Sequence, residues 1–318
     1  MKALVTGAAG FIGSHLIPVL LEKGCGIVAF DMAREAPALE SVADRIKYVQ
    51  GDLGSVSDLY RIMAAEKITD VFHLGALLAG PCEERPLNGF KVNFESTHVL
   101  LDAAAALKVR RFIMLSSIAV FGRDAPEPVL DTAVKNPETV YGQTKLACEH
   151  LLHWYARKRG VDGRALRLTW VFGPGRTTGI TALYSSLILD AFALGRPMEI
   201  PNPDERGDWL YIKDAVSAIY ALWKAESTPQ RIYNIAGGVH SIRDVVEIAR
   251  NIRPEAPVSM AAGGKSLSPY PVAYDDKPAR RDLGWAPAYT VDAAVREHIE
   301  IVSGRRKGQH EKHSGEKP

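Results

Sequence analysis

The first residues pass from a short apolar run through a glycine-rich turn into an amphipathic segment, Leu4-Val-Thr-Gly-Ala-Ala-Gly-Phe-Ile-Gly-Ser-His15. Gly7 permits a tight turn, Gly10 lets the backbone approach a pyrophosphate, and Gly13 lets a helix pack closely on the strand. A glycine trio alone can be an ordinary turn. In this strand–turn–helix context it predicts a dinucleotide-binding site, because the fold that binds dinucleotides begins in this way.

Apolar, strand-like runs alternate with helical segments through the first half of the chain. The runs cover residues 3–6, 27–30, 46–49, 71–74, 112–115 and 165–168. They are predominantly apolar instead of alternating regularly with polar residues, which is typical of parallel strands covered by helices on both faces. We therefore predict an α/β fold with a Rossmann-type, doubly wound parallel sheet.

The pattern loosens after Trp170. We expect a loop at 173–179, a helix over 180–194 and a polar connection over 197–208, then a strand at 232–235 and helices over 242–252 and from 291 to about 302. These pieces are too small for a core of their own, so we predict a small C-terminal α/β cap that binds substrate over the sheet. The expected division is an NAD-binding domain at 1–168, to which 209–236 return, a cap at 169–303 and a flexible tail at 304–318.

Composition excludes several classes of protein. A net charge of +2, with 39 basic and 37 acidic residues, predicts no surface for nucleic acid. No apolar run is long enough to span a membrane, and no signal-like segment follows Met1, so we expect a cytoplasmic protein. The three cysteines, Cys25, Cys82 and Cys148, lie far apart, which predicts neither a disulfide framework nor a metal site.

A second constellation lies in Thr139-Val-Tyr-Gly-Gln-Thr-Lys145. Tyr141 and Lys145 stand at positions i and i+4, so they share one helix face and the ammonium can lie near the phenol. A nearby positive charge lowers the pKa of a phenol from about 10 toward the range of a general base. The Ser116-Ser117 pair closes an apolar run, and a serine hydroxyl from it can hydrogen-bond the same substrate oxygen. Together with the glycine-rich turn these residues predict a redox enzyme, although a lone Tyr-x-x-x-Lys is usually an ordinary surface pair.

Two acidic residues follow predicted strands. Asp31 can accept hydrogen bonds from the adenosine ribose, and its charge would repel a 2′-phosphate, so NAD is predicted over NADP. Arg34 keeps NADP open, because a guanidinium can pair with that phosphate. Asp52 is expected near the adenine, with capping of the next turn as an equal alternative.

These motifs, in this order, resemble the extended short-chain dehydrogenases/reductases, the family of NAD-dependent epimerases and dehydratases, from Met1 to about Val302. The resemblance rests on Thr6-Gly-Ala-Ala-Gly-Phe-Ile-Gly13, Asp31, Gly51-Asp-Leu53, His73-Leu-Gly-Ala76, Val92-Asn93, Leu115-Ser-Ser117, Tyr141-Gly-Gln-Thr-Lys145, Gly173-Pro174, Trp209-Leu-Tyr-Ile-Lys-Asp214 and Leu283-Gly-Trp285. It implies that Ser117 is the catalytic serine, that Tyr141 is the general base or acid, and that Lys145 lowers the pKa of Tyr141 and holds the nicotinamide ribose. It further implies that NAD is bound by Gly7, Gly10, Phe11, Ile12, Gly13, Asp31, Asp52, Leu53, Leu74, Gly75, Ala76, Asn93, Tyr141 and Lys145.

Most members of that family act on nucleotide sugars, and this chain departs from their pattern. An indole, Trp170, stands where an amide is expected, Gly207-Asp208 replaces an Arg-Asp pair, and a late Arg-x-Gly-Asp is missing from 266–274. Because a diphosphate needs cations, these changes favour a smaller substrate. Dehydration is not expected, because Ile118 and Ala119 replace the acidic pair of the dehydratases.

Other segments resemble the L-threonine dehydrogenases of this fold, namely 73–79, 91–93, 175–180 and 275–285. We therefore predict NAD-dependent oxidation of a secondary hydroxyl on a hydroxy acid, a sugar acid or a threonine-like substrate. The expected substrate-binding residues are Ser117, Trp170, Arg176, Thr177 and Thr178. Arg176 can pair with a carboxylate, whereas the two threonines fit a loop and helix cap equally well.

Two other functions stay open at this point. One is a nucleotide-sugar 4-epimerase that keeps NAD tightly bound, and the other is a non-catalytic NAD sensor, which the joint presence of three catalytic residue types disfavours.

Residues 90–109 and 143–158 form apolar helical segments. In relatives the equivalent helices form a dimer interface, so we expect a homodimer, although core helices would look similar.

Overall fold

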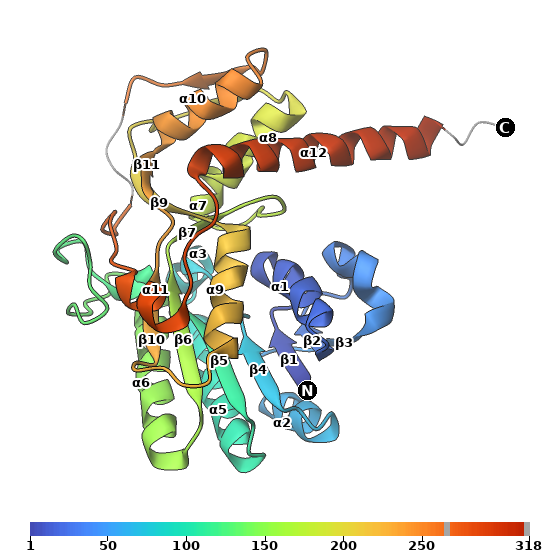
Figure 1. Cartoon of the computed structure of the whole chain (residues 1–318), viewed down its shortest axis with the longest axis vertical. Coiled ribbons are helices and arrows are strands. Elements are labelled where there is room, and N and C mark those ends of the chain that lie inside the picture. The colour runs from blue at the N-terminus through green and yellow to red at the C-terminus, as the bar shows by residue number, and fades with distance from the viewer. Residues whose placement is uncertain (264–267, 315–318) are drawn as a thin grey trace.

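In the computed structural model, which describes residues 1–263 and 268–314, a seven-stranded parallel sheet forms the centre of the molecule (Figure 1). The strand order is β10-β6-β5-β4-β1-β2-β3. It reverses between β1 and β4, which places a crevice at the carboxyl ends of these two strands. The predicted doubly wound sheet is confirmed. Its strands are β1 (Lys2–Thr6), β2 (Gly26–Asp31), β3 (Ile46–Gln50), β4 (Asp70–His73), β5 (Arg111–Ser117), β6 (Gly163–Leu168) and β10 (Ile232–Ile235).

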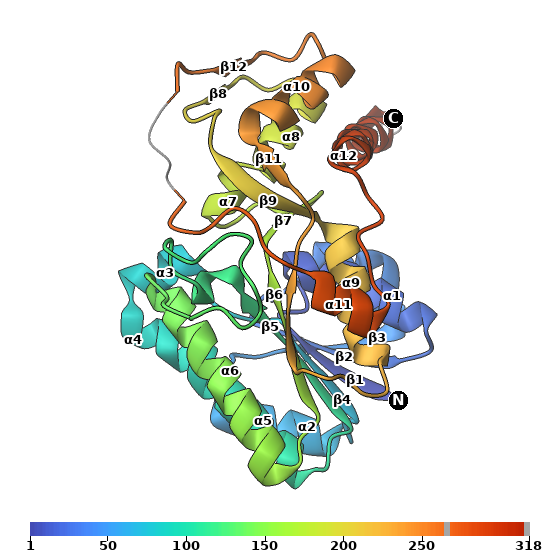
Figure 2. The same ribbon diagram turned by 60° about the vertical axis from the view of Figure 1, so that its left-hand side comes forward.

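Helices cover both faces of this sheet (Figure 2). Leu4 packs in one buried cluster, with residues of α2 (Val56–Ala65), α5 (Ser96–Ala106) and α6 (Val140–Arg159). Its neighbour Val5 packs in the other cluster, with residues of α1 (Phe11–Glu22) and α9 (Ile212–Lys224). Helices exclude water from both faces of the central strands, which is the physical reason why these strands are mostly apolar.

Shorter elements connect the strands and helices of this layer. One of them is a π-helix, a form that is often found at functional sites. They are η1 (Pro37–Arg45, a 3₁₀ helix), α3 (Ala79–Glu84), α4 (Pro86–Gly89), η2 (Phe90–Glu95, the π-helix), η3 (Ile118–Val120, a 3₁₀ helix) and α11 (Lys277–Leu283).

The remaining elements build a cap over the carboxyl ends of the main strands (Figures 1 and 2). β7 (Trp170–Phe172), β9 (Arg206–Tyr211) and β11 (Val239–Ser241) form a three-stranded sheet, and β8 (Met198–Ile200) pairs with β12 (Val258–Met260). Between the cap strands, β10 and α9 return to the main layer, where β10 pairs with β6. The cap helices are α7 (Ile180–Leu183), α8 (Ser186–Leu194), α10 (Ile242–Ile252) and α12 (Val291–Ser314).

The structure corrects three predictions in this half of the chain. The single helix expected over 180–194 is broken after Leu183, where the Ser185 backbone is non-helical (φ −138°, ψ −91°) and its hydroxyl donates to the Thr181 carbonyl at 2.6 Å. The connection expected over 197–208 contains β8 and the start of β9, whose partner strands are distant in sequence. The last helix continues to Ser314, so much of the expected tail is helical, and 315–318 lie outside the described residues. Arg, Lys, Gln and Glu dominate this extension, and such residues prolong a helix that is already anchored.

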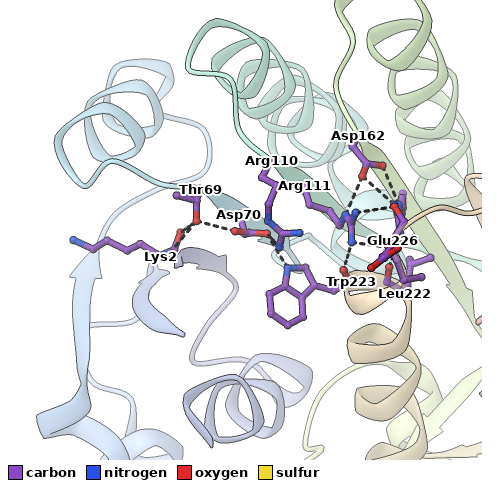
Figure 3. Close-up of polar contacts among 11 residues, drawn as sticks. Lys2, Thr69, Asp70, Arg110, Arg111, Asp162, Leu222, Trp223 and Glu226 are labelled. Carbon is purple, nitrogen blue, oxygen red and sulfur yellow. Dashed lines mark hydrogen bonds and ion pairs between the residues drawn. The ribbon is translucent and has the colours of Figure 1, made fainter. Parts of the chain in front are cut away.

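A polar network at the amino ends of the strands fixes α9 to the sheet (Figure 3). The guanidinium groups of Arg111 and Arg164 donate to carbonyl oxygens at the C-terminal end of α9. The Asp162 carboxylate accepts a hydrogen bond from each of these guanidinium groups at 2.9 Å. The buried Asp70 accepts a hydrogen bond from the indole of Trp223 at 2.8 Å. Cations stabilise unpaired carbonyls at a helix end. The C-terminal end of α9 is thereby held at the amino ends of β5 and β6.

Candidate active site

The glycine-rich turn packs directly on the loop that follows β4. Gly7 has a left-handed backbone with φ of +67°, and a methyl group there would lie 2.6 Å from the backbone of Gly75. At Gly13 a methyl group would lie 2.3 Å from the Gly7 carbonyl oxygen. No side chain fits at either position, so glycine is required for the close packing of β1, the turn and α1 that a pyrophosphate site uses.

Asp31 lies beside this turn at the end of β2. Its carboxylate accepts hydrogen bonds from the Ala9 and Ala33 amides, both at 3.0 Å. The carboxylate therefore braces the glycine turn in addition to its predicted contact with the ribose. Asp52 is exposed and accepts from the Gly54 amide at 2.8 Å, which matches the turn-capping alternative for this residue.

A hydrogen-bonded chain that the sequence did not reveal supports the loop after β4. The Thr6 hydroxyl lies 2.8 Å from His73 Nδ1 and accepts from the Gly75 amide at 3.3 Å. His73 Nε2 lies 3.0 Å from the hydroxyl of Thr97 on α5. Burial lowers the pKa of His73 to about 3, so the imidazole is neutral. The Leu74 amide donates to the Thr6 backbone carbonyl at 3.2 Å. Leu53 packs against this loop.

Asn93, a predicted cofactor residue, lies buried in the π-helix. Its amide oxygen accepts from the Leu77 amide at 2.7 Å, and its amide nitrogen donates to the Leu77 carbonyl at 3.0 Å. The same nitrogen donates to the Thr144 hydroxyl on α6 at 3.1 Å. Asn93 therefore clamps the loop that contains Ala76 to the helix that carries the catalytic candidates.

The three predicted catalytic residues converge at the carboxyl end of β5. Tyr141 lies in the first turn of α6, whose N-cap Thr139 accepts from the Gly142 amide at 3.0 Å. The ammonium of Lys145 lies 5.7 Å from the centre of the Tyr141 ring. Ser117 hydrogen-bonds the Tyr141 phenol. The i, i+4 spacing thus produces the predicted proximity of ammonium and phenol.

The direction of the Tyr141 pKa differs from the expectation. Burial raises the pKa of Tyr141 to about 12, and it outweighs the hydrogen bond from Ser117 and the positive charge of Arg176, which both lower it. Burial also lowers the pKa of Lys145. Low dielectric surroundings disfavour both charged forms, and the spacing argument did not include this cost.

Arg176 extends from the loop after β7 toward Phe11 of the glycine-rich turn and toward Tyr141. Its guanidinium donates to the Val171 carbonyl and the Thr181 hydroxyl, and lies 5.9 Å from the centre of the Phe11 ring. Burial lowers its pKa to about 10, and Tyr141 supplies the charge that raises it. Within 1–263 and 268–314, no carboxylate pairs with it. Thr177 and Thr178, also predicted to bind substrate, are exposed.

Trp170 belongs to the core of the cap. Its ring meets Trp209 edge-on, with centres 6.2 Å apart, and a methyl group on Gly207 would lie 2.4 Å from it. The indole is buried, so it fills space near the site instead of presenting a polar group to it. Ile12 likewise packs against the core.

Tyr270 is a site residue that sequence reasoning missed. It comes from the segment that follows the cap strand β12, yet its phenol hydrogen-bonds Thr139 and is electrostatically coupled to Tyr141. Burial raises its pKa. No local motif signals this approach, because the two tyrosines are far apart in the chain.

The family model described as "NAD dependent epimerase/dehydratase family" matches residues 3–236. The chain belongs to the NAD-dependent epimerase/dehydratase family. The fold and the order of the site residues agree with this result, since the match runs from β1 through β10.

Relatives within this NAD-dependent epimerase/dehydratase family differ in activity. A UDP-glucose 4-epimerase of Corynebacterium glutamicum is 27% identical over 91% of this chain and 92% of its own length. A D-erythronate dehydrogenase of Haemophilus influenzae is 29% identical over 80% of this chain and 84% of its own. The solved structure of an L-threonine dehydrogenase from Cupriavidus necator has a TM-score of 0.87 at 26% identity, covering 95% of this chain and 100% of that one.

The residues of this family member fit NAD, the cofactor of the family. At Gly10 the nearest atom to an added methyl group would be the Gly7 carbonyl oxygen at 3.1 Å, so bare glycine backbone stands between β1 and α1, where a pyrophosphate is expected. Asp31, at the end of β2, lies where an adenosine ribose is expected. Among residues 1–263 and 268–314, no helix is long and apolar enough to cross a membrane, and no three His, Cys, Asp or Glu residues gather as metal ligands.

Proposed function

We propose that the protein oxidises a secondary hydroxyl of a small substrate that carries a carboxylate. The observation that carries this proposal is the convergence of Ser117, Tyr141 and Lys145 beside the guanidinium of Arg176. A base, a hydrogen-bond donor and a cation within one site are the groups that alcohol oxidation needs.

Each side chain has a distinct role in this proposal. NAD, when bound, supplies the acceptor for the hydride that leaves the substrate carbon. The Tyr141 phenolate takes the proton of the substrate hydroxyl. Ser117 accepts a hydrogen bond from the Ala119 amide at 3.1 Å and hydrogen-bonds the Tyr141 phenol, so its hydroxyl lies beside the base and can donate to the substrate oxygen when substrate is bound. Lys145 and Arg176 favour the phenolate because both are cations close to it.

The choice of a small acid over a nucleotide sugar rests on two features of the cap. The buried indole of Trp170 packs on Gly207, and these are two of the positions at which nucleotide-sugar enzymes differ from this chain. Arg176 is a partly buried cation without a carboxylate partner among the described residues. A substrate carboxylate would match its planar donors.

Nucleotide-sugar 4-epimerisation is the second candidate, supported by the similarity to the epimerase of Corynebacterium glutamicum. The two candidates differ in what happens to the hydride. An epimerase returns it to the substrate in each turnover, so NADH does not accumulate, whereas a dehydrogenase releases it as NADH.

The test is NADH formation from NAD with a panel of hydroxy acids, aldonates, uronic acids, threonine and nucleotide sugars. We expect accumulation with at least one carboxylate substrate, and we expect Tyr141→Phe to reduce kcat/KM by a factor of about a hundred or more. Tyr155→Phe is the matched control, because Tyr155 lies on the same helix but donates to Asp102 at 3.1 Å. Full activity in Tyr141→Phe, or epimerisation of a nucleotide sugar without NADH, would refute the proposal.

A further inference from the structure

A buried ion pair lies one helical turn beyond Lys145. Glu149 stands at i+4 from Lys145 on α6, so the two side chains share a face of the helix. The Arg167 guanidinium donates to both oxygens of the Glu149 carboxylate, at 2.7 and 2.8 Å. The Ser116 hydroxyl donates to the same carboxylate at 2.5 Å, and all three residues are buried.

This ion pair anchors the carboxyl end of β5, because the Glu149 carboxylate binds the Ser116 hydroxyl. Ser116 stands between Leu115, whose carbonyl accepts from the Lys145 ammonium at 2.8 Å, and the catalytic candidate Ser117. Two successive residues of β5 are thereby bound to the same face of α6, one to Lys145 and the next to Glu149. A shift of Glu149 would therefore move both Ser117 and Lys145.

The charged and titratable groups that face Lys145 are few. They are Tyr141, Cys148 and Glu149 from α6, Cys82 from α3, and His73 from β4. Burial raises the pKa of both thiols and lowers that of His73, so these groups are neutral near pH 7. Within the described residues, the arginine-bound carboxylate of Glu149 is the anion that faces Lys145. Burial lowers the pKa of Lys145, and Cys148, Cys82 and Glu149, in that order, oppose this effect; of the three, Glu149 is the one that the Arg167 guanidinium keeps ionised by two hydrogen bonds.

We propose that Glu149 is a positioning residue of the active site, which keeps Lys145 protonated by its charge and aligns Ser117 through Ser116. This inference rests on the proposed function, because it assigns Glu149 a role in the same oxidation. It goes beyond that function because it assigns control of the Lys145 charge to the buried Glu149–Arg167 ion pair, which does not contact the substrate.

Glu149→Gln separates charge from shape. The variant keeps the size of the side chain, removes the anion and leaves the Arg167 cation unbalanced, and both electrostatic changes disfavour protonated Lys145. We expect the pKa of Lys145 to fall by about one unit or more, and the alkaline limb of the kcat/KM profile to move down by the same amount. Glu149→Asp retains the charge and should shift the pKa less. Ser116→Ala retains the charge as well, so it should lower kcat without moving the limb.

The readout that does not depend on activity is the NMR chemical shift of the Lys145 ε-carbon, followed against pH in protein with isotope-labelled lysine and assigned with Lys145→Met. If Glu149→Gln fails to fold, the double variant Glu149→Gln/Arg167→Met removes both charges. It should show a smaller fall in the Lys145 pKa, because the repulsion from Arg167 is lost as well.

Asp162→Asn is the control for a purely structural effect. It removes the charge of Asp162 and so weakens its ion pairs with Arg111 and Arg164, at the amino ends of the strands (Figure 3). It should lower the melting temperature and leave the Lys145 pKa in place. An unchanged Lys145 pKa in Glu149→Gln or the double variant, or an equal shift in Asp162→Asn, would overturn the inference. A shifted pKa in an enzyme that oxidises none of the substrates would instead refute the proposed function alone.

Discussion

The buried carboxylate of Asp208, in the cap, allows the cost of a buried charge to be measured as a change in the free energy of unfolding. One oxygen of its carboxylate accepts from the Thr169 hydroxyl at 2.8 Å and from the Gly237 and Gly238 amides at 2.7 and 3.4 Å. Burial nevertheless raises the pKa of Asp208 to about 6, and the negative charge of Asp276 adds to this. Asp208→Asn keeps the accepting oxygen and removes the buried charge.

The magnitude follows from the difference between the folded and unfolded pKa values. The pKa rises from 3.8 to about 6, a difference of about two units. At about 1.4 kcal/mol per unit, this corresponds to about 3 kcal/mol of folding free energy. The folded chain holds the proton more tightly than the unfolded chain, so the wild type loses this stability as the pH rises from about 4 to about 6. Above that range the loss is complete.

The assay is urea unfolding of wild type and Asp208→Asn at several pH values between about 4 and 8. The other titrating groups are common to both proteins, so they cancel in the difference. We expect equal stability near pH 4 and a variant that is more stable by up to about 3 kcal/mol above pH 6. A difference that does not change with pH, or a variant that is less stable at neutral pH, would show that the buried charge does not carry this cost.

Two glycine substitutions test the packing around the site. Gly7→Ala should abolish NAD binding, measured by calorimetry, because the new methyl group would lie 2.6 Å from the Gly75 backbone. Gly24→Ala, also at a left-handed position but with open space around it, should bind NAD normally. Gly207→Ala should cost about 1–3 kcal/mol in unfolding experiments, because its methyl group would meet the Trp170 ring. Combination with Trp170→Leu should recover part of this loss, and an additive cost would exclude the clash.

Local patterns were sufficient for the main sheet and for the proximity of the catalytic candidates. A strand that is buried on both faces is recognisable by itself, because most of its positions are apolar. The i, i+4 spacing fixed Tyr141 and Lys145 on one face of α6, since helix geometry is the same in every fold. The same spacing puts Lys145 and Glu149 on one face of α6, but the ion pair with Arg167 could not be predicted from it, because Arg167 comes from β6.

The cap and the energetics of the site depended on residues that are distant in the chain. β8 and β9 were missed because their partner strands come from other parts of the sequence. Trp170 proved to be a core residue only once Gly207 and Trp209 were placed against it. Tyr270 reaches Tyr141 from a segment without any motif of its own.

The sequence by itself determined the family, the glycine turn for NAD and the pairing of phenol and ammonium, because each depends on a short stretch of backbone. Only the tertiary structure decided how strongly these groups are desolvated. It raised the pKa of Tyr141 instead of lowering it, and it placed Arg176 beside the phenol without a carboxylate partner among the described residues. Desolvation depends on every atom packed around a group, and most of those atoms come from remote parts of the chain.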